Sequence, residues 1–74
     1  MTGIFRFESS YRIVLKNGKD EQVTVKVVEP LPGDWEIITE NRPHTKETAA
    51  TAVWLIDVPA KQETTLTYRV QVRL

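Results

Sequence analysis

Histidine and carboxylate side chains are the first candidates for chemistry in this 74-residue chain. His44 is the only histidine, and it lies in a polar segment with Glu40, Asn41 and Glu47 that suggests a metal-binding or acid–base role. A lone imidazole without a second histidine or any cysteine makes a poor transition-metal site. We therefore expect His44 to be a solvated loop residue, and we expect no metal site and no bound cofactor.

The other residue types with catalytic potential lack a catalytic arrangement. Glycoside cleavage needs two carboxylates held across a rigid cleft, whereas the acidic residues here occupy polar strand positions or corners, where turn formation explains them. Serine and threonine hydroxyls need a neighbouring base to become nucleophiles, and no base lies at a recognisable spacing. Gly3, Gly18 and Gly33 stand alone, so no glycine-rich phosphate loop occurs. The sequence predicts that the chain is not an enzyme.

Four aromatic residues remain as candidates for binding: Tyr11, Trp35, Trp54 and Tyr68. Together they could form a face on which a sugar or peptide stacks, or they could fill the core that a small domain requires. All four fall on inward positions of the predicted strands, which favours the core. Trp35 also adjoins a corner, where one edge of its ring can stay exposed. Trp35 and its adjacent loops are therefore the candidate for carbohydrate or peptide stacking, an alternative function for the chain.

Charge and length exclude several classes of protein. Ten basic and ten acidic residues cancel and are interspersed, so the basic patch of a nucleic-acid-binding protein is missing. No apolar run is long enough for a membrane-spanning helix. With no cysteine, no disulfide can stabilise the fold. A chain of this size buries only about 60% of its unfolded surface, so its core is marginal.

The elements that must carry these residues are strands. Apolar residues alternate with polar ones in five stretches, which begin at Phe5, Val23, Trp35, Ala52 and Leu66; the first ends at Leu15 and the last at Leu74. A period of two is typical of strands with one buried face. Two small sheets packed face to face can bury these faces, whereas one open sheet cannot. Residues 1–74 are therefore predicted to form a single all-β domain, a small immunoglobulin-like β-sandwich of five to seven antiparallel strands without significant helix.

The connections follow from the register and from proline. A two-residue hairpin at Asn17-Gly18 would place the apolar face of one strand beside the polar face of the next. We expect instead an odd-length loop or an arch that crosses between the sheets, with Gly18 at positive φ. Pro30 ends the second strand. The longest loop is predicted at residues 41–48; within residues 46–50 a single helical turn is an alternative to an irregular connection.

Five segments, taken in order, resemble the C-terminal part of bacterial domain-of-unknown-function family 4139. They are Tyr11–Asn17, Val23–Val27, Leu31–Ile37, Trp54–Ala60 and Thr65–Val72. The resemblance covers nearly the whole chain from Tyr11 onward. It implies a non-catalytic C-terminal β-sandwich module excised from a larger protein that is periplasmic, secreted or part of the cell envelope. It also implies upstream domains as partners and no site residues.

Val53 and Leu55 flank Trp54 and make their strand apolar on both faces. Such a strand is either covered on both sides or buried in an interface. We therefore expect a structural or protein-interaction module, which forms a homodimer through Val53 and Leu55 or through an edge strand. Val14 and Ile38 are also apolar at positions that should be polar, and clustering with Val53 and Leu55 would enlarge the patch.

Overall fold

A computed structural model describes residues 6–73 of the chain; Phe5 and Leu74, expected at the outer ends of the first and last strands, lie outside this range. Its elements are six strands: β1 (Arg6–Lys16), β2 (Val23–Pro30), β3 (Asp34–Glu40), β4 (Thr45–Thr48), β5 (Thr51–Val58) and β6 (Glu63–Arg73). No helix occurs among the described residues. The all-β prediction is therefore confirmed.

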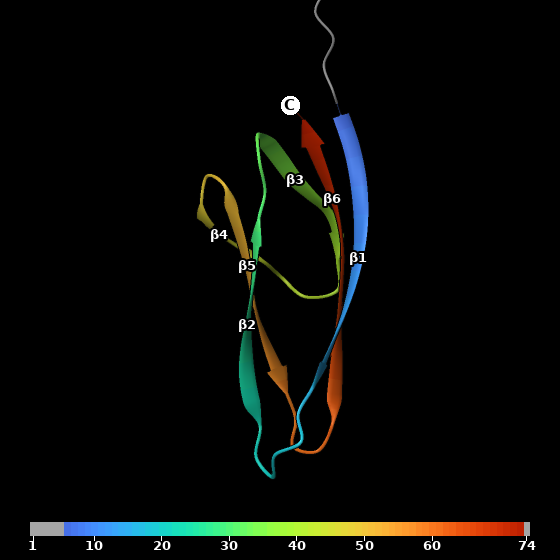
Figure 1. Ribbon diagram of the computed structural model, residues 1–74, viewed down its shortest axis with the longest axis vertical. Helices are drawn as coiled ribbons and strands as arrows, with labels where there is room; N and C mark the ends of the chain where they lie inside the picture. The colour runs from blue at the N-terminus through green and yellow to red at the C-terminus, as the bar shows by residue number, and fades with distance from the viewer. Residues whose placement is uncertain (1–5, 74) are drawn as a thin grey trace, which may run out of the picture.

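The strands form two three-stranded antiparallel sheets, which face each other as a sandwich (Figure 1). Sheet A has the order β1-β6-β3 and sheet B has the order β2-β5-β4. β5 and β6 are thus the central strands, and they lie opposite each other across the interior. Every other strand is outermost in its sheet. The predicted β-sandwich is confirmed.

Most connections cross from one sheet to the other. β4 and β5 form a hairpin within sheet B, and the four remaining connections join a strand of sheet A to a strand of sheet B. Of the two alternatives predicted between the first two strands, the arch is the one present. The expectation of an irregular segment at residues 41–48 is wrong in its second half, because β4 pairs there with β5 through Thr45 and Lys46. β4 is only four residues long, too short for a clear period-two pattern.

The core comes mainly from the inner faces of β5 and β6. Its buried apolar side chains are Leu31, Ala52, Trp54, Ile56, Val58, Leu66, Tyr68, Val70 and Val72. Side chains of the outer strands pack against this cluster and are only partly buried, because each outer strand has a neighbour on one side only. Tyr11 was expected in the core but is an exposed residue, since it lies on the outermost strand β1. The core is therefore a narrow strip between the two central strands.

Asn17 links the two arches at the end of the sandwich where β1 leads to β2 and β5 leads to β6 (Figure 1). Its buried side-chain amide donates to the carbonyls of Glu21 (2.7 Å), Val58 (3.1 Å) and Pro59 (3.2 Å). Its Oδ1 accepts from the backbone N–H of Lys19 at 2.9 Å, which closes a side-chain turn. One side chain thus supplies hydrogen-bond partners for carbonyls of both arches.

The expected positive φ at Gly18 is wrong. Positive φ angles among the described residues occur at Gly33 (66°) and Lys61 (58°). The Asn17 side chain turns the first arch by bonding the N–H of Lys19, so Gly18 has no need of the left-handed conformation. The second arch bends at Lys61 instead, whose N–H donates to the carbonyl of Lys19 at 3.0 Å.

Replacing Asn17 with alanine should lower the free energy of unfolding by about 1–3 kcal/mol, because buried carbonyls lose their donor. Urea denaturation measures this change. Thr24→Ala is the matched control: it removes an exposed side-chain bond, from Thr24 to Asp57, and should change stability by less than about 0.5 kcal/mol. Equal stability of the two variants would contradict the role of Asn17.

Candidate functional site

A row of aromatic rings runs from β1 through the core to the loop before β4 and then to β3. The centroid distances along this aromatic row are 5.1 Å for Tyr11–Tyr68, 4.3 Å for Tyr68–Trp54, 5.9 Å for Trp54–His44 and 6.0 Å for His44–Trp35. The first two pairs are stacked, each with an interplanar angle of 27°. Because Tyr68 lies on β6 and Trp54 on β5, their stack joins the two sheets. The inward positions predicted for these two residues are thus observed.

Glu40 binds two neighbouring rings of the aromatic row, Trp54 and His44. Its carboxylate accepts from the indole N–H of Trp54 (3.1 Å), lies 2.9 Å from Nδ1 of His44 and accepts from the backbone N–H of His44 (3.4 Å). His44 lies in the loop before β4 as predicted, but it is not fully solvated: its ring is half-buried between two tryptophans. A bulge between Ile37 and Thr39 shifts the register of β3 and places Glu40 opposite Tyr68, on the inner face.

Glu29 is the second carboxylate that serves an interior ring. It lies on β2 and accepts from the phenol O–H of Tyr68 at 3.2 Å. Burial raises the pKa of the Tyr68 phenol well above its usual value near 10, and the negative charge of Glu29 and the hydrogen bond to it raise that pKa further. Tyr68 therefore stays protonated and donates a hydrogen bond to Glu29. Among the described residues, no buried side-chain nitrogen or oxygen lacks a partner.

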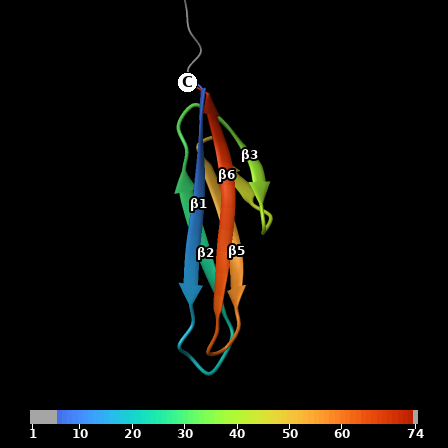
Figure 2. The ribbon, with the colours of Figure 1, turned by 90° about the vertical axis from the view of Figure 1, so that its right-hand side faces the viewer.

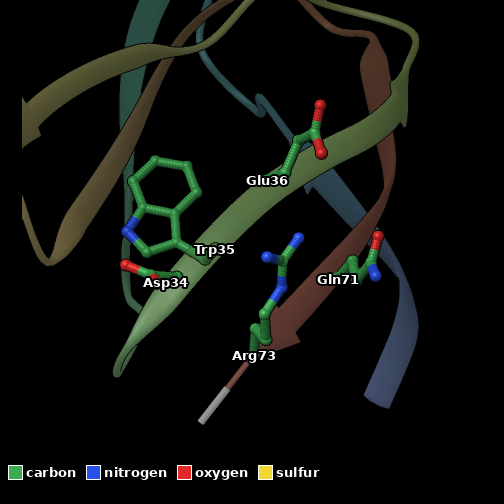
Figure 3. A pocket seen from close by; sticks show the side chains of 5 residues that line it. All are labelled: Asp34, Trp35, Glu36, Gln71 and Arg73. Atoms are coloured by element: carbon green, nitrogen blue, oxygen red, sulfur yellow. The ribbon is translucent and has the colours of Figure 1, made fainter. Parts of the chain in front are cut away.

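Trp35 lies at the margin of the core, and its ring is partly engaged within the chain. Its indole N–H donates to the carbonyl of Ala49 at 2.9 Å, and Nζ of Lys46 lies 5.1 Å from the ring centroid. A surface hollow of about 310 Å³ adjoins the ring and is lined by Asp34, Trp35, Glu36, Gln71 and Arg73 (Figure 3).

The polar residues of this hollow do not share a sheet face with the Trp35 ring. Trp35 pairs with buried Val72, whereas Glu36 pairs with Gln71 on the outer face of sheet A. Figure 3 accordingly places the ring and the Arg73 side chain on different sides of β3. Glu36, Gln71 and Arg73 therefore do not frame a face of the ring.

The outer face of sheet B carries the apolar residues proposed for self-association. Val53 and Leu55 lie on β5, and Val28 of β2 pairs directly with Val53. Leu55 is 66% exposed and Val28 is 50% exposed, but Val53 is only 7% exposed. Nζ of Lys26 on β2 lies 3.4 Å from Oε1 of Glu47 on β4, so this ion pair spans β5 beside Val53. The exposed apolar strip therefore consists of Val28 and Leu55.

Val14 and Ile38 do not join this strip. Val14 pairs with Thr65 in sheet A, and Ile38 lies at the bulge of β3 in the same sheet. Both are exposed. The four apolar residues that depart from the predicted pattern are thus divided between the two layers of the sandwich and form no single patch.

Two residues of these sites, Glu29 and Val28, were not singled out from the sequence, and Glu40 was named only as a polar neighbour of His44. Glu29 occupies an inward position after Val25 and Val27, so an acidic residue in an apolar register was a usable signal. Val28 breaks the same alternation. Glu40 gave no such signal, because its inward position depends on the bulge before Thr39.

Within residues 6–73, no group of three or more histidine or acidic side chains is placed to hold a metal ion. No helix in this range is long and apolar enough to cross a membrane. Comparisons with protein-family models, with curated proteins and with solved structures found no match. The resemblance to domain-of-unknown-function family 4139 stays a prediction.

The raised pKa of Tyr68 predicts a loss of stability in alkali. The folded state retains the phenol proton, whereas the unfolded chain releases it near pH 10. The free energy of unfolding should hold its Tyr68 contribution below pH 10 and lose it above, by up to about 1.4 kcal/mol per pH unit. Urea denaturation between pH 9 and 12 should show a smaller decline for Tyr68→Phe than for the wild type. Identical declines would contradict this assignment.

The two tryptophans should differ in access to a quencher. Trp54 is fully buried and Trp35 is partly exposed, so acrylamide should quench one fraction of the emission and spare the other. Trp35→Phe should remove the quenchable fraction and leave blue-shifted emission. If Trp35→Phe emission remains readily quenched, Trp54 is not enclosed.

Proposed function

We propose that this chain is a non-catalytic, immunoglobulin-like β-sandwich module that serves protein–protein association through the outer face of sheet B. The exposed Val28 and Leu55 side chains on adjacent strands are the observation that carries this proposal. Apolar side chains grouped on a sheet face, with a polar margin, are typical of contact surfaces. The interior polar groups support a structural role: Glu29 and Glu40 are engaged by ring donors.

A second copy of the chain is the occupant that this face suits. A two-fold axis brings the same apolar strip of each copy against the other. Lys26 and Glu47 supply charges of both signs beside the strip. A margin that carries both signs of charge is compatible with a second copy of itself.

We further propose, on the sequence resemblance alone, that the module belongs to a larger bacterial protein of the cell envelope or periplasm. In that setting the homodimer would join two larger chains. The association itself remains a property of residues in this domain, so it can be measured on the chain as it stands.

Leu55→Glu should weaken self-association by tenfold or more, because burial of a leucine contributes about 1.5–3 kcal/mol and a buried carboxylate is costly. Sedimentation velocity over a range of concentrations measures the effect. Ile38→Glu is the matched control, since it places the same charge at an exposed apolar position of sheet A. A wild type that stays monomeric, or a Leu55→Glu variant that associates equally well, would contradict the proposal.

A further inference from the structure

Strand β1 presents a long edge with no partner strand. It pairs with β6 over all eleven residues without a register shift, and no described strand lies on its other side (Figure 2). The remaining outer strands carry features that hinder edge pairing: a bulge in β3, a bulge in the short β4, and Pro30 at the end of β2. β1 has neither proline nor bulge, so its edge is open to a further strand.

The N-terminal half of β1 also leaves apolar surface uncovered. Phe7 and Tyr11 share the inner face of sheet A with Val72 and Tyr68, their partners on β6. They are nevertheless 46% and 42% exposed, whereas residues nearer the end of β1, such as Ile13, pack against the core. An added strand beside residues 6–14 would cover both rings.

The charges of β1 favour a second β1 in one register. On the outer face, Glu8 and Arg12 lie symmetrically about Ser10. An antiparallel copy centred on Ser10 sets each Glu8 opposite Arg12 of the other copy, and opposite charges in directly facing positions stabilise a sheet. On the inner face, Tyr11 meets Ser9 and Phe7 meets Ile13, so the largest rings face smaller side chains.

The neighbouring registers are unfavourable. Side chains alternate, so the other two-fold arrangements that keep apolar residues on the inner face have their axes at adjacent residues. An axis at Ser9 places Arg6 opposite Arg12, and an axis at Tyr11 places Arg6 opposite Lys16. Like charges that face each other destabilise the pairing. Of the three central registers, only the one at Ser10 pairs opposite charges without opposing like ones.

The geometry points to an antiparallel β1–β1 contact between two copies of this chain, centred on Ser10, which joins their sheets A into one six-stranded sheet. This inference rests on the proposed association function and adds a second contact surface to it. The two-fold axis is perpendicular to the sheet, so the inner faces of both copies stay on the same side. The outer face of sheet B belongs to the other layer and remains accessible for its own contact.

Charge exchange tests this contact in a Leu55→Glu background, which removes the sheet-B contact. Arg12→Glu and Glu8→Arg each set like charges opposite one another and should weaken the remaining dimer about tenfold or more. The double variant, Glu8→Arg with Arg12→Glu, restores opposite charges and should restore dimerisation. An equimolar mixture of the two single variants should form a heterodimer. Glu8→Arg also removes the exposed Glu8–Arg69 pair, which contributes little to folding.

Sedimentation velocity reports the dimer, and hydrogen exchange reports its site. Amides of β1 should gain protection as the concentration of the Leu55→Glu protein rises, and Arg12→Glu should abolish the gain. A monomeric Leu55→Glu protein without this gain overturns the edge contact and leaves the sheet-B proposal intact. Association without rescue by the double variant also overturns it. If only the sheet-B proposal is wrong, the wild type and the Leu55→Glu variant should dimerise to the same extent through β1.

Discussion

The stacked rings of Trp54 and Tyr68 join two sheets that each have one central strand. Their centroids are 4.3 Å apart, and each ring lies on the central strand of its own sheet. A chain of this size cannot bury many side chains on its outer strands. The contact between β5 and β6 therefore carries most of the fully buried apolar surface. Other features of the molecule are arranged around this narrow strip.

Large rings in a thin core require partners for their polar atoms. An indole N–H or a phenol O–H that lost its partner in the interior would cost free energy. Glu40 and Glu29 supply these partners from the outer strands β3 and β2, where their carboxylates remain partly accessible to water. These two acidic residues, which a catalytic hypothesis would single out, thus accept hydrogen bonds from the rings of the aromatic row.

A thin core also explains where apolar surface remains exposed. Outer strands have a neighbour on one side only, so Phe7 and Tyr11 on β1 lie partly open although they face inward. β5 is central in sheet B, yet within residues 6–73 no further layer covers the outer face of that sheet, and Leu55 is exposed there. The edge of β1 and the face of sheet B are accordingly the surfaces on which association of this module would depend.

Period-two alternation alone determined the strand class, the inward positions of Trp54 and Tyr68 and the need for a second sheet, because side-chain direction along a strand is a local property. Proline placed the end of β2, and register excluded a two-residue hairpin after β1 but left the arch and an odd-length loop as alternatives. Only the tertiary structure decided the inward position of Glu40, the stacking of His44 and the linking role of Asn17. Each of these depends on a bulge or on a hydrogen bond to residues distant in the chain, such as Val58, and no local pattern encodes such contacts.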